Sequence, residues 1–492
     1  MRIFELIPGA AAWITLLGLI FLSWKLPQVV VIFILLYDLY WLLKLFYLFL
    51  HLRYAFSKTR KNLRTDWLRK LKAEGLDWER IRHLVILPTY REPYEVVEKS
   101  FASLAAANYP QENMLVVLAS EERGGVGDRE TAARIREKFG GVFGGFLLTF
   151  HPAGIAGELP GKGSNETWAA RRGVEELIDR RGIPHEDVIV SVFDVDTRTE
   201  KDYFGVLSDS FLRAEHPLHS SYQPIPLFTN NLKETKFFAR LIGFSSTFWQ
   251  LMQSSRPEQL VTFSSHSIPL PALIDVGFWE TNLVSEDSRI FFQCLAHYNG
   301  DWRTVPLFYP VSMDAVVGKT FWESMKNLYR QQRRWAWGSE NFAYLMRDLK
   351  KNNKIPRKVK RFWTWTMFDG FYSWSTSSFI IFLFGLLPNV LGNEHFKSSL
   401  LSYNLPRMTG IILNLSTIGI IVSAVLSLIL MAPRIEGFKK RHYLYYLVEW
   451  ALMPLVFIFF GAIPALDAQT RLMIGGKARL GYWRTPKATK NS

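Results

Sequence analysis

The stretch VIVSVFDVD, residues 188–196, is an apolar run that ends in two aspartates spaced one residue apart. A short run rich in β-branched residues predicts a buried strand, which would deliver Asp194 and Asp196 to one edge of a sheet. Open α/β sheets bind ligands at the carboxyl ends of their strands. Two carboxylates at such an edge suit a divalent cation that holds a phosphorylated ligand. The stretch therefore predicts an α/β fold with a site at its end, although Asp-x-Asp alone is a weak signal.

Apolar, strand-like runs alternate with helix-like segments around this stretch. We expect strands at 84–87, 114–119 and 145–150, and helices at 94–107, 131–139, 166–179 and 232–254. This β-α-β alternation is typical of a mostly parallel sheet.

Long apolar segments lie on both sides of the predicted sheet. They fall at roughly 6–24, 28–50, 370–390, 407–432 and 443–468, and each approaches the ~20 residues that a helix needs to span a bilayer. The first lacks a strongly basic start and a second follows after a short turn, so we expect an anchoring hairpin rather than a secretory signal. We therefore divide the chain into a transmembrane hairpin (1–52), a soluble domain (53–345), interfacial and transmembrane helices (346–470) and a basic tail (471–492).

The charge of the chain is strongly positive, with 59 Lys and Arg against 44 Asp and Glu. Much of this charge flanks the apolar segments, which by the positive-inside rule places the soluble domain in the cytoplasm, at the plasma (inner) membrane. No nucleic-acid-binding motif accompanies it, so membrane lipids and an anionic substrate account for it more simply. The single cysteine, Cys294, excludes an intramolecular disulfide and suits a reducing compartment.

Five short motifs follow one another in the soluble region. They are Pro88-Thr89-Tyr90-Arg91-Glu92, Gly161-Lys162-Gly163-Ser164-Asn165, Asp194-Val195-Asp196, Ser285-Glu286-Asp287 and Gln331-x-x-Arg334-Trp335. Their order resembles the membrane-embedded family 2 glycosyltransferases, the group of cellulose, chitin and hyaluronan synthases, from about residue 83 to 340. The resemblance implies a GT-A-type, Rossmann-like mixed sheet inserted between N- and C-terminal transmembrane helices. It also implies transfer of a sugar from a nucleotide-sugar donor, with inversion at the anomeric carbon.

The resemblance also implies roles for individual residues. Asp196 would be the metal ligand, with Asp194 beside it holding metal and nucleotide, and the cation would be Mg²⁺ or Mn²⁺. Asp287 would be the catalytic base and Glu286 its acidic neighbour. The donor, most commonly a UDP-sugar in this family, would contact Thr89, Tyr90, Glu92, Glu121, Lys162 and Asn165. Acceptor and phosphate would contact Gln331, Arg334 and Trp335.

Two positions depart from the family pattern, and two motifs have a structural alternative. Ser285 stands where threonine is commonest, and Glu121 stands where many relatives carry aspartate. Ser285 could also be the N-cap of a helix with acids in its first turn. Arg330 and Arg333 could form the basic face of an interfacial helix that meets anionic lipid.

The tail Tyr482-Trp483-Arg484-Thr485-Pro486-Lys487 resembles a gating loop of some of these synthases. Thr485 and Lys487 would then close on the diphosphate, whereas the alternative is a basic tail held by lipid. A gate must lie on the side of the soluble domain, yet three crossings after that domain would leave the tail on the other side. Either one apolar segment therefore does not fully cross, or the tail is not a gate. The segment 443–468, interrupted by Glu449 and two prolines, is the first candidate for an irregular path, and 363–372 is the second.

The sequence thus favours a membrane glycosyltransferase that makes a polysaccharide, with a glycolipid-forming enzyme as the alternative. A transporter would explain the apolar helices but not the soluble region, and no inverted repeat is visible. An inactive scaffold is disfavoured because every acid that the mechanism needs is present.

Overall fold

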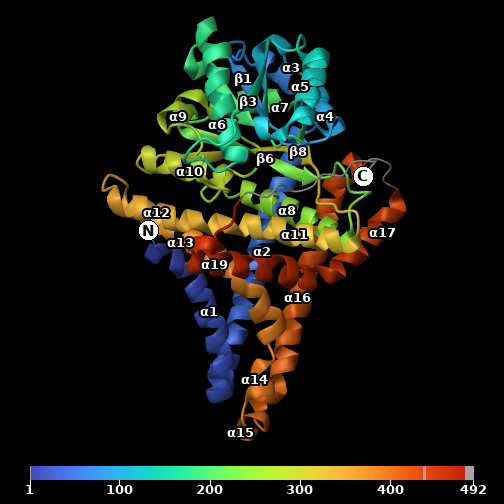
Figure 1. Ribbon diagram of the computed structural model, residues 1–492. Helices are drawn as coiled ribbons and strands as arrows, with labels where there is room; N and C mark the ends of the chain where they lie inside the picture. The colour runs from blue at the N-terminus through green and yellow to red at the C-terminus, as the bar shows by residue number, and fades with distance from the viewer. Residues whose placement is uncertain (1, 436–438, 482–492) are drawn as a thin grey trace.

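A computed structural model describes residues 2–435 and 439–481 of the chain. An α/β domain lies above a layer of flat helices, and a narrow stalk of helices extends from the other side of that layer (Figure 1). This arrangement confirms the predicted α/β domain inserted between N- and C-terminal apolar helices.

The domain is built on a mixed sheet of eight strands in the order β3-β2-β1-β4-β7-β6-β8-β5. The strands are β1 (Arg82–Pro88), β2 (Met114–Glu121), β3 (Gly145–His151), β4 (Val188–Val192), β5 (Arg198–Thr199), β6 (Ser220–Phe228), β7 (His266–Pro269) and β8 (Arg303–Met313). Strands β3, β2, β1 and β4 run parallel, while β7 is antiparallel to both β4 and β6. The predicted strand of VIVSVFDVD is confirmed as β4, a buried strand in the middle of the sheet.

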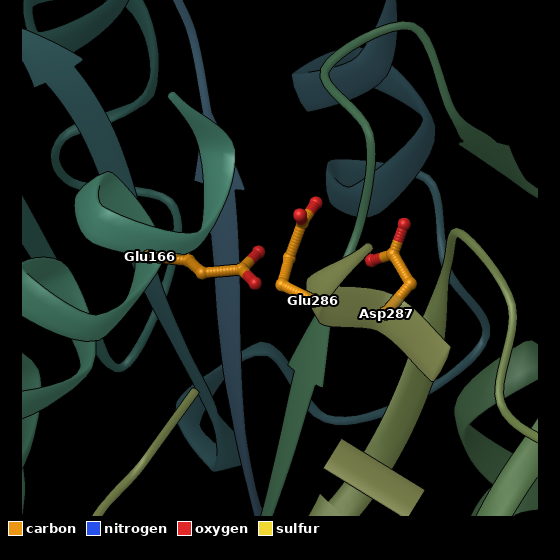
Figure 2. A group of neighbouring side chains, drawn as sticks. All are labelled: Glu166, Glu286 and Asp287. Carbon is orange, nitrogen blue, oxygen red and sulfur yellow. The ribbon is translucent and has the colours of Figure 1, made fainter. Parts of the chain in front are cut away.

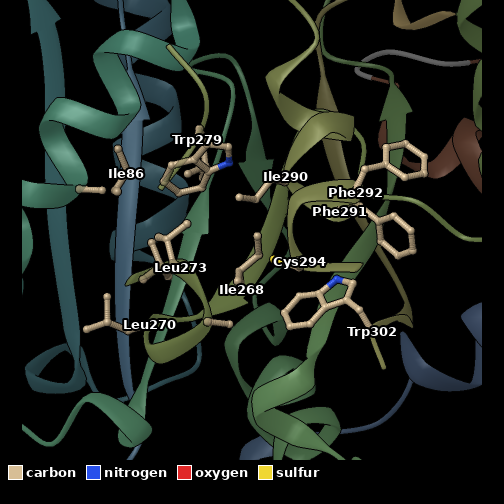
Figure 3. Packing of buried hydrophobic residues seen from close by; sticks show 14 of the residues in the cluster. Ile86, Ile268, Leu270, Leu273, Trp279, Ile290, Phe291, Phe292, Cys294 and Trp302 are labelled. Atoms are coloured by element: carbon tan, nitrogen blue, oxygen red, sulfur yellow. The ribbon is translucent and has the colours of Figure 1, made fainter. Parts of the chain in front are cut away.

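Helices cover both faces of this sheet. They are α3 (Trp67–Ala73), α4 (Tyr94–Ala105), α5 (Val126–Phe139), α6 (Lys162–Gly173), α7 (Tyr203–Arg213), α8 (Phe237–Ser254), α9 (Leu270–Asp275) and α10 (Glu286–His297). Alternate residues of β1 point to opposite faces: Ile86 packs with Ile268, Trp279 and residues of α10 (Figure 3), whereas Val85 joins the core on the other face. Both faces are therefore buried, as expected for strands that read as continuous apolar runs.

Helix α6 begins at Lys162, four residues before the predicted start at Glu166. Its glycine-rich first turn is helical because Gly163 packs closely on neighbouring backbone: a Cβ there would lie 2.9 Å from the Glu280 carbonyl oxygen. The side chain of Ser164 also donates to the carbonyl of Gly161 at 3.0 Å. Lys162 and Asn165 consequently lie on a helix rather than in a loop.

The flat layer beneath the domain contains α11 (Phe321–Ala336), α12 (Glu340–Lys351), α13 (Arg357–Phe379), α17 (Lys440–Glu449), α18 (Met453–Val456) and α19 (Ile463–Ile474) (Figure 1). Asp467 of α19 accepts hydrogen bonds from the Tyr329 hydroxyl and the Arg333 guanidinium of α11, each at 2.9 Å. The charge of Arg333 is therefore paired within the protein, and the alternative in which Arg330 and Arg333 meet anionic lipid stays a prediction.

The stalk contains α1 (Arg2–Lys25), α2 (Pro27–Asn62), α14 (Leu387–Leu391), α15 (Glu394–Lys397) and α16 (Leu400–Met431). Within the described residues, four helical stretches are long and apolar enough to cross a membrane: Arg2–Lys25, Pro27–Asn62, Leu400–Met431 and Leu444–Ile474. The expected span at 370–390 is not among them; the helix there changes to a π-turn at Ile380–Phe384 and restarts at Leu387. Helix α2 also continues unbroken beyond the expected boundary at residue 52.

The last of these four stretches does not join the stalk. Helices α17 and α19 lie along the base of the domain, beside α11 (Figure 1). The chain therefore returns to the side of the domain after α16 and stays there through α19. This is the path suspected for 443–468 from its internal glutamate and prolines.

Candidate active site

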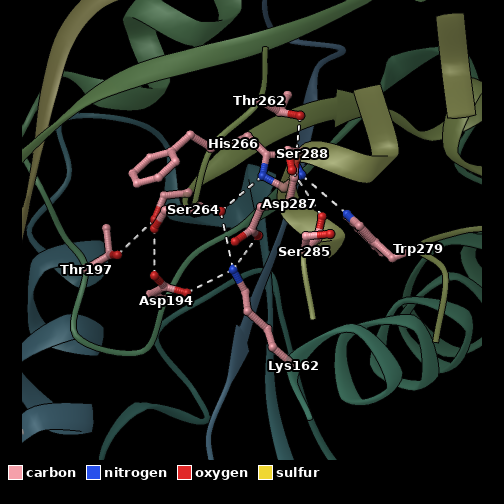
Figure 4. A network of polar contacts seen from close by, with 12 residues as sticks. Lys162, Asp194, Thr197, Thr262, Ser264, His266, Trp279, Ser285, Asp287 and Ser288 are labelled. Atoms are coloured by element: carbon pink, nitrogen blue, oxygen red, sulfur yellow. Dashed lines mark hydrogen bonds and ion pairs between the residues drawn. The ribbon is translucent and has the colours of Figure 1, made fainter. Parts of the chain in front are cut away.

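Three of the predicted site residues meet at one ammonium group. The Nζ atom of Lys162, in the first turn of α6, lies 2.9 Å from Oδ1 of Asp194 and 2.6 Å from Oδ1 of Asp287 (Figure 4). It also donates to the carbonyl of Ser264 at 3.3 Å. Asp194 follows β4 and Asp287 lies in the first turn of α10, so the site joins three separate elements.

The electrostatics of this cluster follow from burial and from the excess of acids. Burial alone would lower the pKa of Lys162, but the fields of Asp194 and Asp287 hold it well above its ordinary value. Burial raises the pKa of Asp287 to about 7 against the opposing pull of Lys162. Burial also raises the pKa of Glu166, one turn further along α6, well above its usual range. A carboxyl group with a pKa near neutrality is suited to accept a proton during catalysis.

Asp194 and Asp196 are held in different ways. Oδ2 of Asp194 accepts a hydrogen bond from the Ser264 hydroxyl at 2.6 Å, and Ser264 has a positive φ of 50°, a strained conformation for a residue other than glycine. Asp196 is buried, and its Oδ2 accepts the backbone N–H of Asp314 at 2.9 Å. Two carboxylates at a strand end fit Mg²⁺ or Mn²⁺, which take one or two protein carboxylates and complete their shell with phosphate and water.

A further acid of the site, Glu166, faces the start of α10. Glu166, Glu286 and Asp287 lie close together (Figure 2). One carboxylate oxygen of each residue lies within 4.8 Å of one oxygen of each of the other two. Sequence reasoning missed Glu166 because the motif was taken to end at Asn165. Its position four residues after Lys162, on the same helical face, is the signal that identifies it once α6 is known to start at Lys162.

The first turn of α10 is held by the start of α12. The hydroxyl of Ser285 donates to Oε1 of Glu340 at 2.6 Å, and the indole of Trp337 donates to Oε2 at 3.0 Å. Ser285 stands at the N-cap position with Glu286 and Asp287 in the first turn, as the structural alternative expected, but its side chain makes no cap hydrogen bond. Burial raises the pKa of Glu340 despite the nearby Arg289. Glu340 was not predicted, because nothing in the sequence indicates that α12 lies against α10.

The Gln331, Arg334 and Trp335 side chains lie on α11. Gln331 is buried, and the Trp335 ring meets the Phe263 ring edge-on at 5.6 Å between centroids. Phe263 precedes Ser264, so α11 adjoins the wall of the site. Arg334 forms no ion pair with any side chain in the described ranges, which leaves its charge for an anionic partner.

The residues predicted to bind the nucleotide gather at the ends of β1 and β2. The guanidinium of Arg123 lies 4.0 Å from the centroid of the Tyr90 ring, and its Nη2 lies 2.9 Å from Oε1 of the buried Glu121. The Asn165 amide donates to the carbonyl of Ala119 at 2.7 Å.

Thr89 and Glu92 are also buried at this edge. Arg123 was missed from sequence because its role depends on the packing of a glycine-rich turn.

The two predicted gating residues, Thr485 and Lys487, lie outside the described residues. The chain leading toward them is described as far as Gly481. Leu480 packs beside a cluster that includes Val284 and Trp337, close to the start of α10.

Comparisons with known proteins give a family and several distant structural neighbours. The mannosyltransferase PcManGT from Pyrobaculum calidifontis, in complex with GDP-Man and Mn²⁺, has a TM-score of 0.40 and 15% identity over 86% of this chain and 99% of that chain. TarS 1-349 from S. aureus, in complex with UDP-GlcNAc, has a TM-score of 0.38 and 12% identity over 80% of this chain and 91% of that chain. No curated protein matches the chain. The model of the family described as "Glycosyl transferase family group 2" matches residues 189–463, more than half of the sequence, so the chain belongs to this family of glycosyltransferases.

Proposed function

We propose that this family 2 glycosyltransferase moves a sugar from a nucleotide-sugar donor to a saccharide acceptor at a membrane, with inversion at the anomeric carbon. The observation that carries the proposal is the contact of Lys162 with both Asp194 and Asp287. One ammonium group thereby joins the acid assigned to the donor with the acid assigned to the acceptor. A donor diphosphate and an attacking hydroxyl would meet at this point.

The donor side of the reaction is assigned to Lys162, Asp194 and Asp196. Asp196 and Asp194 would hold Mg²⁺ or Mn²⁺, which as a Lewis acid neutralises charge on the leaving diphosphate. Lys162 adds a cation that already lies in the site and can exchange a carboxylate partner for a phosphate oxygen. Ser264 keeps Asp194 oriented through its hydroxyl.

The acceptor side is assigned to Asp287, with Glu286 beside it. Asp287 takes the proton of an acceptor hydroxyl as that oxygen attacks the anomeric carbon, and the bond from this carbon to the diphosphate oxygen breaks. A single displacement of this kind inverts the configuration. Gln331, Arg334 and Trp335 would bind acceptor and phosphate, because Arg334 has no ion-pair partner in the described chain and Trp335 lies beside Phe263.

We assign nucleotide binding to residues at the ends of β1 and β2. Tyr90, stacked under Arg123, and the buried Glu121 would contact the base, and Thr89 and Glu92 lie at the same edge. Asn165 and Lys162 would lie along the diphosphate and the sugar. We propose a UDP-sugar of a hexose or an N-acetylhexosamine, by analogy with the family.

We propose a polysaccharide as the product and the plasma membrane as the location, with the catalytic domain in the cytoplasm. Basic residues occupy the end of α2, and Arg434, which follows α16, pairs with Glu200 of the α/β domain at 2.5 Å. Both basic regions therefore lie on the domain side, as the positive-inside rule requires for a cytoplasmic domain. The second candidate is a transferase that glycosylates a lipid, which the position of the site above the flat helices also permits.

The proposal is tested on detergent-purified protein with Mg²⁺ or Mn²⁺ and a panel of nucleotide sugars. We expect one donor to release its nucleoside diphosphate, and the length of a radiolabelled product distinguishes polymer from glycolipid. Asp287→Asn should lower turnover by about 10²–10⁴-fold, the usual contribution of a general base, while nucleotide affinity changes less than about threefold. Asp196→Ala should instead weaken metal-dependent nucleotide binding. Equal loss of binding in both variants would contradict this division of roles.

A further inference from the structure

The Glu166 side chain is a buried acid to which the proposed reaction assigns no role. It is fully buried, and neither of its carboxylate oxygens has a hydrogen-bond partner within residues 2–435 and 439–481. Its carboxylate points toward that of Glu286, which is 4% exposed (Figure 2). A buried carboxylate without a partner is costly, so this side chain indicates a ligand.

The backbone around Glu166 brings the acids close together. Gly163, in the first turn of α6, packs so tightly on α10 that a Cβ there would lie 3.2 Å from Cβ of Glu286. Glu166 and Glu286 thus face each other from two helix starts, with Asp287 as a third acid. Each residue provides an oxygen within 4.8 Å of the other two, a separation that one ion could bridge.

The local charges do not balance. The ammonium of Lys162 contacts Asp287 and Asp194 at 2.6 and 2.9 Å, so it is already shared between two acids. In their ionised forms, the forms that bind a cation, the carboxylates of Glu166 and Glu286 would add two further negative charges at the same place. One divalent cation would compensate these two charges.

We propose that Glu166, Glu286 and Asp287 bind a hard divalent cation at a site separate from the donor-linked cation of Asp194 and Asp196. All three ligands are carboxylates, the donors that Mg²⁺, Mn²⁺ and Ca²⁺ prefer. Both Glu166 oxygens are closed to solvent, which argues against a sugar as their ligand. The ion would tie the first turn of α6 to that of α10.

This site would also act on the base of the proposed reaction, and that part of the inference rests on the proposed function. An ion held by both Glu166 and Asp287 would fix the position of the Asp287 carboxylate relative to the first turn of α6. Glu166 would then be a positioning residue that acts through the ion rather than on the substrate.

The test is Mn²⁺ binding to the full purified chain, by equilibrium dialysis, with and without UDP. We expect the wild-type protein to bind one Mn²⁺ per chain without nucleotide, and a second when UDP is added. Glu166→Gln should lose the first ion and keep the second, whereas Asp196→Ala should lose the second and keep the first. Glu158→Gln, a glutamate outside the cluster that pairs with His151, is the matched control and should bind both.

Two further readouts keep the result decisive if Glu166→Gln folds poorly. Glu166→Asp keeps the charge but shortens the side chain, and we expect at least tenfold weaker binding of the nucleotide-independent Mn²⁺. Mn²⁺ alone should raise the Tm of the wild-type protein and not that of Glu166→Gln. Absence of a nucleotide-independent ion in the wild type, or its retention in Glu166→Gln, would overturn the proposal in favour of a proton shared between Glu166 and Glu286. If the wild-type protein binds the nucleotide-independent Mn²⁺ but turns over no donor, the result would count against the proposed function and not against this ion site.

Discussion

Lys162 illustrates how one side chain stabilises the site before any donor arrives. It is 11% exposed, and its ammonium is shared by two carboxylates from different elements. Removing one partner of a buried ion pair leaves an uncompensated charge, which is more costly than the net value of the pair.

We expect Lys162→Met to lower the free energy of unfolding by about 3 kcal/mol and to weaken donor binding at least tenfold. Thermal unfolding and nucleotide binding measure the two effects. Arg172→Met, which breaks an exposed ion pair with Glu175 on the same helix, should cost less than about 1 kcal/mol. Equal effects of the two substitutions would contradict the role given to Lys162.

His83 makes stability depend on pH. It is fully buried in β1, with Nε2 3.0 Å from the Ser208 hydroxyl, and burial lowers its pKa to about 3. Below pH 6.5 His83 is protonated in the unfolded chain but stays neutral in the folded chain. The free energy of unfolding therefore falls as the pH is lowered from 6.5 toward 3. Between pH 6.5 and 5.0 we expect a loss of about 2 kcal/mol from this residue. The loss should be absent from the pH series of His83→Gln; an unchanged slope would show that His83 is not its source.

At the scale of elements, the start of α12 positions the start of α10. The Ser285 hydroxyl and the Trp337 indole both donate to Glu340, and Asn341 accepts from Arg289 at 2.6 Å. The helix that carries the assigned base is thereby fixed to the segment that directly follows Trp335. The motif at Ser285 and the motif that ends at Trp335, about 45 residues apart in the sequence, are thus connected through the start of α12.

We expect Ser285→Ala to lower kcat tenfold or more while leaving nucleotide affinity within about twofold, because the hydrogen bond to Glu340 is worth about 1–2 kcal/mol. Steady-state kinetics and nucleotide titration separate the two quantities. The control is Ser245→Ala on α8, whose hydroxyl donates to a carbonyl of its own helix. In the double variant with Glu340→Gln, additive effects would show that the two residues are not coupled.

For the whole molecule, the structure predicts which segments lie on opposite sides of a membrane. Helix α15 lies at the far end of the stalk and α12 lies under the domain (Figure 1). We expect an impermeant maleimide to label Lys397→Cys and Lys350→Cys from opposite sides of sealed vesicles. Cys294 is fully buried, so the maleimide should not label this natural cysteine. Labelling of both positions from the same side would contradict this topology.

The sequence predicted the parts of the fold and site that depend on local pattern. The apolar run before Asp194 gave β4, and the motifs containing Lys162 and Asp287 lie in contact in the structure. Glu166, Arg123 and Glu340 were missed because their significance arises from packing between elements distant in the sequence. The contact between Asp467 of α19 and Arg333 of α11 likewise joins elements distant in the sequence, and hydropathy cannot indicate it.

The first and last helices of the described chain are joined by their ends. Arg2 donates to the carbonyls of Leu472 and Ile474 at 2.9 and 2.6 Å, which satisfies acceptors at the C-terminal end of α19. The buried Glu5 accepts from Arg479 at 2.5 Å. During synthesis on the ribosome, α1 emerges long before α19 exists, so the charges at its start must remain without these partners until α19 and Arg479 have been translated. The contacts that join the two ends of the described chain can therefore form only late in its synthesis.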